Sequence, residues 1–214
     1  MFLEEEDFSK LNLAVIGLGY VGLPLAIKFA STKNKSKHNF LNQVIGFDIN
    51  KFRIGDLEKG IDKTKEVSSI EFQDANNIIF TNEEKFLNMA DIYIITVPTP
   101  IDKYKNPNLT PLKKSSESVG KALKDRKGIE KKFLPIIIYE STVFPGATEE
   151  VCVPIIEKFS GLKAGSDFYY GYSPERINPG DKKHKISDIV KVTSGCCKNS
   201  SITINNLYSK IIAA

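Results

Sequence analysis

Three glycines between two apolar runs form the first pattern in the chain that points to chemistry. Gly17, Gly19 and Gly22 give the order G-x-G-x-x-G, directly after a predicted strand at 11–17 and directly before a predicted helix at 22–31. In a nucleotide-binding turn, the first glycine makes the tight turn, the second lets the backbone approach a pyrophosphate and the third lets helix and strand pack closely. The helix N-terminus then offers free N–H groups to the phosphates. The glycines alone also fit a simple packing turn.

An acidic residue after the second predicted strand favours the nucleotide interpretation. Asp48 lies at the end of the strand predicted at 43–49, and dinucleotide sites place an acid for the ribose diol roughly 20 residues after their glycines. Its carboxylate would repel a ribose 2′-phosphate, so the pattern favours NAD over NADP. The alternative role for Asp48 is that of an acid at a helix N-terminus. Arg53 follows nearby, either as a surface cation or as a group near the adenosine that weakens this preference.

Strands and helices must alternate along the chain to position these residues, and the apolar pattern predicts that they do. Short, nearly continuous apolar runs are typical of strands buried on both faces. Their alternation with helical stretches predicts an α/β fold of the Rossmann type: a doubly wound, mostly parallel sheet with helices on both faces. The segment 60–76 fits either a helix or a loop. Strands are expected at 11–17, 43–49, 77–82, 91–98, 133–142, 167–174 and 189–195, and helices at 22–31, 51–59, about 110–125, 146–160 and 200–214.

Composition and charge narrow the classes of partner. The 214 residues are 41% hydrophobic and 26% charged with a net charge of +4, and no basic helix or aromatic–basic stripe points to nucleic acid. No apolar run reaches the roughly 18 residues of a membrane span, and the acidic start MFLEEEDFSK is unlike a signal peptide. Cys152, Cys196 and Cys197 lack zinc-site spacing, and their odd number without an export signal indicates the cytoplasm. We therefore expect a cytoplasmic protein that binds a small ligand, without a metal site, nucleic acid or a membrane partner.

Four longer motifs follow one another in the chain: GLGYVGLPLA (17–26), VPTP (97–100), ESTVFPGATEEVCVPIIE (140–157) and GYSPERINPGD (171–181). In this order they resemble the UDP-glucose/GDP-mannose dehydrogenase family, over essentially the whole chain. Within the family, the chain is most similar to the branch that oxidises UDP-GlcNAc or UDP-GalNAc. The resemblance implies oxidation of the sugar C6 alcohol to an aldehyde and then to a carboxylate, with two NAD per turnover, in the synthesis of capsule or O-antigen precursors.

The resemblance also assigns roles to individual residues. Thr142 is expected near the reacting carbon, where it helps to hold a catalytic water, and Glu175 in the active site, where it serves proton transfer or thioester hydrolysis. Glu175 and Arg176 are the expected contacts to the UDP-sugar. The expected cofactor-binding residues are Gly17, Gly19, Tyr20, Val21, Gly22, Asp48, Arg53, Pro98, Thr99 and Thr142.

Several of these residues have an ordinary structural role as an alternative. Thr99 and Thr142 follow predicted strands, and ligands of open α/β sheets lie beyond the carboxyl ends of the strands. Ser141 or Thr142 also fits the N-cap of the next helix. Glu175, next to a loop rich in proline and glycine, fits a general base or a surface salt bridge.

One part of the family pattern is absent. Some members follow the glutamate of the SPE motif with an aromatic residue and, four positions on, a second acid. Here Arg176 follows Glu175, and Pro179 stands at the second position. This departure argues against a mechanism with two carboxylates.

The family's nucleophilic cysteine belongs to a second domain that has no counterpart here. Cys152 lies on the apolar side of a predicted helix, and Cys196 and Cys197 have no base nearby in sequence, so none is expected to be catalytic. We expect an NAD-binding Rossmann domain at 1–200, and at 201–214 the start of a helix that leads to an absent C-terminal half.

This organisation predicts a fragment that is inactive alone and a full-length enzyme that is a homodimer or larger. The alternative is a free-standing NAD(H)-binding module or sensor without dehydrogenase activity. A weaker alternative is a dehydrogenase of the β-hydroxyacid type, which would be expected to lack SPERINPGD.

Overall fold

One twisted sheet runs through the centre of the molecule. In the computed structural model, which describes residues 8–126, 133–175 and 190–212, seven strands lie in the order β3-β2-β1-β4-β5-β6-β7. All neighbouring pairs are parallel except β6 and β7, which are antiparallel. The order of the first six strands is that of dinucleotide-binding Rossmann folds. The strands are β1 (Asn12–Ile16), β2 (Gln43–Phe47), β3 (Ile78–Thr81), β4 (Ile92–Ile95), β5 (Ile136–Tyr139), β6 (Tyr169–Tyr172) and β7 (Ser194–Gly195).

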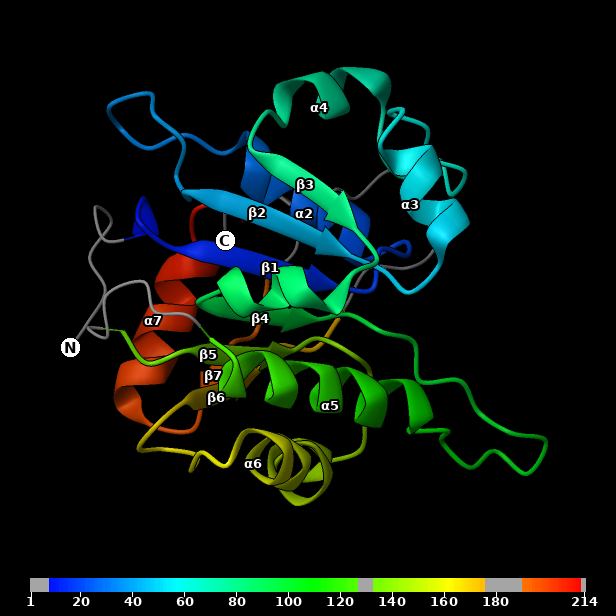
Figure 1. Cartoon of the computed structure of the whole chain (residues 1–214), viewed down its shortest axis with the longest axis vertical. Helices are drawn as coiled ribbons and strands as arrows, with labels where there is room; N and C mark the ends of the chain where they lie inside the picture. The colour runs from blue at the N-terminus through cyan, green and yellow to red at the C-terminus, as the bar shows by residue number, and fades with distance from the viewer. Residues whose placement is uncertain (1–7, 127–132, 176–189, 213–214) are drawn as a thin grey trace.

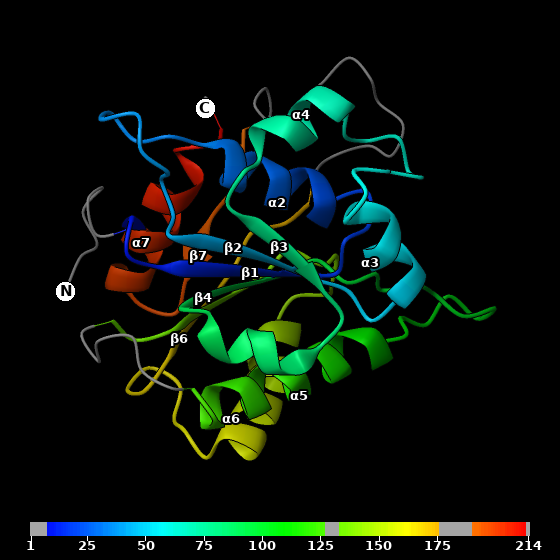
Figure 2. The same cartoon turned by 45° about the horizontal axis from the view of Figure 1, so that its top comes forward.

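Helices cover both faces of this sheet. Figure 2 shows α2 and α7 on one side of the sheet and α5 and α6 on the other. The predicted α/β Rossmann-type fold is therefore confirmed. The helices are α2 (Gly22–Ser31), α3 (Lys51–Leu57), α4 (Ser69–Asp74), the 3₁₀ helix η1 (Glu84–Met89), α5 (Thr110–Lys124), the π-helical turn η2 (Thr148–Cys152), α6 (Val153–Ser160) and α7 (Lys198–Tyr208).

The alternation of side chains along β1 divides the core into two layers. Leu13 and Val15 point to the layer that contains α2 and α7, whereas Ala14 and Ile16 point to the layer that contains α5 and α6. Both layers are apolar along residues 13–16, which explains why this part of the strand has a continuous apolar sequence. Ile204 of α7 belongs to the same layer as α2.

Three predicted elements differ in extent or form from the structure. Of the residues predicted as a strand at 189–195, those described are 190–195, and among these only Ser194 and Gly195 pair with β6. Val190 and Val192 lie exposed, whereas Lys191 points inward. The helix predicted at 146–160 begins at Thr148 as a π turn and continues directly as α6. Pro154, which has no N–H to donate, is the second residue of α6. The helix predicted at 200–214 spans Lys198–Tyr208, and the undecided segment 60–76 contains the short α4.

Candidate cofactor and catalytic site

The glycine turn lies at the carboxyl edge of the sheet, where the arrowheads of β1 and β2 end in Figure 1. Gly17 has φ +95°, and a Cβ there would lie 3.2 Å from the backbone N of Val97. A Cβ at Gly22 would lie 1.9 Å from the carbonyl oxygen of Gly17. A Cβ at Gly19 would have no atom within 4 Å. The turn is therefore closely packed at its first and third glycines and open at its second, as a site for a pyrophosphate requires.

The start of α2 also fits an anion site. Its N-cap residue, Val21, provides no side-chain hydrogen bond to the first turn. The N–H of Leu23 donates to the carbonyl oxygen of Gly19 at 3.1 Å and Pro24 has no N–H, so the N–H of Gly22 is the one in the first turn that is left for a ligand or for water. Val21 itself is buried, and the side chain of Tyr20 is 43% exposed. Of these two expected cofactor-binding residues, only Tyr20 presents its side chain to the surface.

Asp48 supports the turn from the end of β2. Its Oδ2 accepts a hydrogen bond from the backbone N–H of Leu18 at 2.8 Å, and its Oδ1 accepts one from Asn50 N at 2.8 Å. A carboxylate has about four acceptor positions, so these two bonds leave capacity for a ribose diol. Asn50, rather than Asp48, caps α3. The alternative role of Asp48 as a helix N-terminal acid is therefore wrong.

Arg53 contacts the same turn from α3. Its Nε–H donates to the carbonyl oxygen of Leu18 at 2.9 Å, and its Nη1 forms an ion pair with Asp62 at 2.8 Å. Its side chain is only 11% exposed, so the alternative of a surface cation is wrong. The partner Asp62 lies in the segment 60–76 and was not expected from the sequence.

Two hydrogen bonds join the loops that follow β4 and β5. The hydroxyl of Thr99 donates to the carbonyl oxygen of Thr142 at 2.6 Å, and the hydroxyl of Ser141 donates to that of Val97 at 2.6 Å. Thr142 and Pro98 are exposed. Since η2 begins only at Thr148 with Ala147 as its N-cap residue, neither Ser141 nor Thr142 caps that helix. The structure thus brings the two predicted threonines together.

Glu175 lies in a buried cluster of polar side chains next to these loops. Its side chain is 9% exposed, and its Oε2 lies 3.8 Å from the Nζ of Lys191. Lys191 also pairs with the fully buried Glu140, and the hydroxyl of Tyr208 donates to the same carboxylate. The alternative of a surface salt bridge for Glu175 is therefore wrong, because the pair lies inside the protein.

Burial controls the electrostatics of this cluster. It raises the pKa of Glu140, and the neighbouring ammonium of Lys191 offsets this rise only in part. Burial also raises the pKa of Tyr208, and the nearby charge of Glu140 adds to the effect. The cluster therefore contains two carboxyl groups and one ammonium in a desolvated place, and the raised pKa of Glu140 favours retention of its proton.

Some functional candidates were missed from the sequence, and one predicted residue lies outside the described residues. Glu140, Lys191 and Tyr208 were not singled out, although Glu140 directly follows the apolar strand β5, where a charged residue is a signal. Thr96 was also missed; its hydroxyl lies 2.6 Å from the carbonyl oxygen of Gly17. Arg176, the expected substrate contact, falls outside the residues that the structure describes.

Within the part of the chain that the structure describes, the thiols of Cys196 and Cys197 contact the hydroxyl of Ser200 and not a basic side chain. Burial raises the pKa of the Cys152 thiol to about 11. The exposed Cys197 thiol has a lowered pKa because Ser200 hydrogen-bonds to it. Within the described ranges, His, Cys, Asp and Glu side chains form no group of three or more that is able to hold a metal ion. None of the helices described there combines the length and apolar character needed to cross a membrane.

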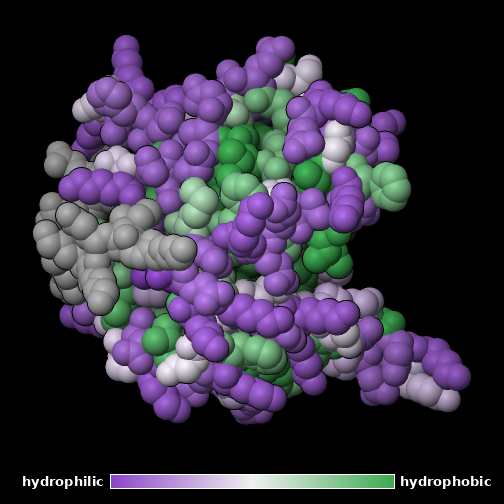
Figure 3. All heavy atoms as spheres, viewed as in Figure 1, coloured by the Kyte–Doolittle hydropathy of each residue, from purple (hydrophilic) through white to green (hydrophobic). Residues whose placement is uncertain are grey.

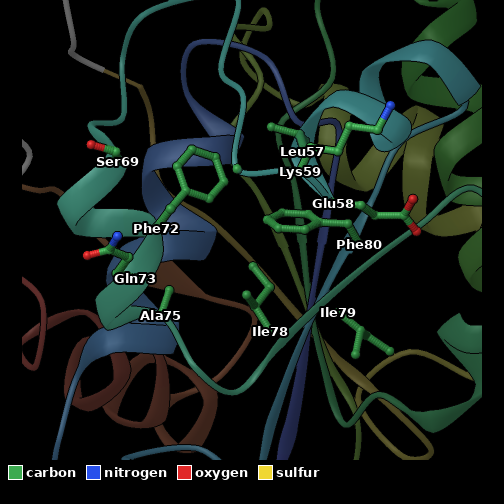
Figure 4. A pocket seen from close by; sticks show the side chains of 11 residues that line it. Leu57, Glu58, Lys59, Ser69, Phe72, Gln73, Ala75, Ile78, Ile79 and Phe80 are labelled. Atoms are coloured by element: carbon green, nitrogen blue, oxygen red, sulfur yellow. The ribbon is translucent and has the colours of Figure 1, made fainter.

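A separate hollow of about 600 Å³ lies between α3, α4 and β3. Figure 4 shows Phe72 and Phe80 beside it, and Figure 3 shows exposed apolar side chains over this part of the molecule. None of the expected cofactor or catalytic residues lines it. The predicted site residues gather instead at the carboxyl edge of the sheet.

Comparison with known proteins agrees with this geometry. The model of the UDP-glucose/GDP-mannose dehydrogenase family, NAD binding domain, matches residues 11–212. A UDP-N-acetyl-D-glucosamine 6-dehydrogenase from Pseudomonas aeruginosa is 52% identical over 95% of this chain and 44% of its own length. Protein CapL from Staphylococcus aureus is 49% identical over 95% of this chain and 44% of its own length. The chain thus spans about half the length of the curated relatives it matches.

Solved structures show the same relationship. The NDP-N-acetyl-D-galactosaminuronic acid dehydrogenase from Methanosarcina mazei Go1 superposes with a TM-score of 0.80 at 26% identity, over 97% of this chain and 44% of that one. The UDP-D-ManNAc dehydrogenase from Pyrococcus horikoshii superposes with a TM-score of 0.75 at 28% identity, over 94% of this chain and 45% of that one. Together with the open glycine turn and the acid beside it, these matches show that the chain belongs to the UDP-glucose/GDP-mannose dehydrogenase family and corresponds to its NAD-binding domain.

Proposed function

We propose that this chain is the NAD-binding portion of a nucleotide-sugar 6-dehydrogenase, which oxidises the C6 alcohol of UDP-GlcNAc or UDP-GalNAc to the uronic acid with two NAD. The 52% identity to a relative named for UDP-N-acetyl-D-glucosamine supports this class of substrate. The observation that carries the proposal is structural. The linked loops of Thr99 and Thr142 and the buried Glu175 follow neighbouring strands and lie at the same edge of the sheet as the glycine turn.

In this proposal, the cofactor is held by the open backbone at Gly19, the N-terminus of α2 and the carboxylate of Asp48. The bound NAD supplies a hydride acceptor. Pro98, Thr99 and the exposed Thr142 form the wall of the site beyond β4 and β5. Thr142 positions the water that is needed to convert the aldehyde to the acid.

Glu175 is the proposed proton-transfer group. Its carboxyl group is shielded from solvent and lies 3.8 Å from the ammonium of Lys191. A carboxyl group that is held in a desolvated place at the site can exchange a proton with the substrate hydroxyl or with water. We propose Arg176, the next residue in the chain, as a contact to the UDP-sugar.

We further propose that the thiol nucleophile comes from outside these 214 residues and that the chain alone is inactive. Cys152 is buried, and among the described residues the thiols of Cys196 and Cys197 have the hydroxyl of Ser200 as their hydrogen-bond partner. We propose that the full-length enzyme acts in the synthesis of surface polysaccharide precursors and assembles as a homodimer or larger, which light scattering tests directly.

The decisive experiment compares the 214-residue chain with the full-length protein that contains it. Each is incubated with NAD and, in turn, UDP-GlcNAc, UDP-GalNAc, UDP-glucose and UDP-ManNAc, and NADH absorbance is followed. The proposal expects turnover of an N-acetylhexosamine substrate by the full-length protein, loss of this turnover in Glu175→Gln, and no turnover by the shorter chain.

The other outcomes each contradict a defined part of the proposal. NAD binding without turnover of any sugar by the full-length protein would favour an NAD(H)-binding module. Turnover of UDP-glucose alone would overturn the substrate class. Steady NADH formation by the shorter chain, lost on Cys196→Ser or Cys197→Ser, would overturn the assignment of the nucleophile.

A further inference from the structure

The backbone of one residue in the glycine turn is held from both sides by groups of opposite charge. The N–H of Leu18 donates to Asp48, and the C=O of Leu18 accepts from the guanidinium of Arg53. The carboxylate and the guanidinium therefore lie at adjacent points of the same turn, at the end of the site where the adenosine ribose binds. In Rossmann sites, an acid at this place binds the 2′-hydroxyl of NAD, whereas an arginine accommodates the 2′-phosphate of NADP.

Asp62 forms an ion pair with the guanidinium of Arg53. Its Oδ1 accepts from Nη1 at 2.8 Å, its side chain is 1% exposed, and Nη2 lies 3.3 Å from the hydroxyl of Thr64. Nε already donates to Leu18, so three of the five N–H groups of the arginine, one on each nitrogen, have a partner within the protein. The charge of Arg53 is therefore balanced by Asp62, and these three bonds orient its guanidinium.

The surrounding loop holds Asp62 in its ionised form. Thr64 donates to Oδ1 through both its backbone N–H and its hydroxyl, and Glu66 N and Val67 N donate to Oδ2 at 2.8 and 3.1 Å. Burial alone would raise the pKa of Asp62, but the hydrogen bonds from Thr64 and Arg53 outweigh it and lower the pKa below its ordinary value. A carboxylate held in this way is a persistent counter-ion.

We propose that Asp62 is a specificity-determining residue for the cofactor. Because Asp62 holds Arg53 in an ion pair, the guanidinium is not available to bind a ribose 2′-phosphate. Asp48 then faces the ribose without a competing free positive charge, and NAD is preferred. The proposal concerns the NAD-binding domain itself and does not depend on the identity of the sugar substrate.

The test is calorimetric titration of the 214-residue chain with NAD and with NADP at one ionic strength. In Asp62→Asn, Arg53 loses its counter-ion, and the ratio of the Kd for NADP to the Kd for NAD should fall about tenfold, since a charge-assisted hydrogen bond to the phosphate is gained. Asp56→Asn is the matched control. It removes an equal charge from an ion pair with Lys63 on the exposed side of α3, and it should leave the ratio unchanged.

Two further variants separate specificity from stability. In the double variant Asp62→Asn/Arg53→Met, the ratio should return at least to the wild-type value, because no cation remains for the phosphate. Thr64→Val removes the hydroxyl that contacts both Asp62 and Arg53, and should shift the ratio in the same direction by a smaller factor, even if Asp62→Asn does not fold. An equal loss of affinity for both cofactors, or a gain in NADP affinity that persists without Arg53, would overturn the proposal.

Discussion

At the scale of single residues, the glycine turn shows how one motif combines opposite steric demands. Gly22 is required by packing, since a Cβ there would overlap the carbonyl oxygen of Gly17 at 1.9 Å. Gly19 has no such constraint from the protein, because a Cβ added there would meet no atom within 4 Å. In the proposed site, the need for glycine at position 19 arises from the ligand, whose pyrophosphate would approach the backbone there.

This contrast yields a prediction from two matched substitutions. Gly22→Ala should reduce the free energy of unfolding by at least about 2 kcal/mol, because the methyl group meets rigid backbone. Gly19→Ala should change it by less than about 1 kcal/mol, yet weaken NAD binding at least about tenfold, since the methyl group occupies the approach to the phosphates. Urea unfolding and calorimetry provide the two measurements. NAD affinity that is unchanged in Gly19→Ala would reduce the motif to a packing turn.

At the scale of elements, the predictions succeeded where apolar residues determine the structure and failed where charges do. The core strands followed from continuous apolar runs, because both faces of β1 are covered by helices. The run IVKVTSG at 189–195 suggested another such strand. The structure exposes Val190 and Val192 and turns Lys191 inward, toward Glu140 and Glu175. In an extended segment, a shift of one residue moves every side chain to the opposite face. Here the carboxyl groups of Glu140 and Glu175, which are distant in sequence, favour the face on which Lys191 points inward.

The link between β5 and α7 through Glu140 and Tyr208 predicts a pH dependence of stability. Burial raises the pKa of Glu140 above its ordinary value of 4.5, so the folded protein binds a proton more tightly than the unfolded chain does. The stability contributed by this group is fully present below pH 4.5 and is lost as the pH rises through the raised pKa. In this window the free energy of unfolding, relative to Glu140→Gln, should fall by up to about 1.4 kcal/mol per pH unit.

Urea unfolding of the wild type and of Glu140→Gln over a series of pH values measures this difference. Two parallel curves would show that Glu140 does not exchange a proton during unfolding. If the free energy of unfolding of the wild type instead rises with pH relative to that of Glu140→Gln, then Lys191 and Tyr208 lower the pKa of Glu140 by more than burial raises it.

At the scale of the whole molecule, the family and the Rossmann fold were predictable from the motifs, whereas the connections between them were not. Gly17, Asp48 and Thr142 lie at the edge that the strand order predicts. The contact of Asp62 could not be predicted from the sequence, because this residue lies in a segment without periodicity and its partner, Arg53, is reached only through the tertiary structure. Sequence patterns report which side chains are buried by regular elements, and they carry little information on polar contacts between loops.

The molecule as a whole should respond to NAD by thermal stabilisation. Saturation at 100 times the Kd stabilises a fold by about 2.7 kcal/mol, which for a domain of this size corresponds to a rise in Tm of roughly 5–10 °C. Differential scanning fluorimetry measures the rise. Gly19→Val provides the control, since it should fold but show no rise. If NADP raises the Tm of the wild type as much as NAD does at equal concentration, then the preference attributed to Asp48 is wrong.

The paired hydrogen bonds between the loops after β4 and β5 have a consequence for the entropy of binding. Thr99 is tied to Thr142, and Ser141 is tied to Val97, so the two loops have few independent motions even in the free protein. A ligand that bridges them immobilises one preorganised unit rather than two separate segments, and less conformational entropy is lost on association. The same cross-links make movement of the wall a concerted event: a displacement of the loop after one strand carries the loop after the other with it.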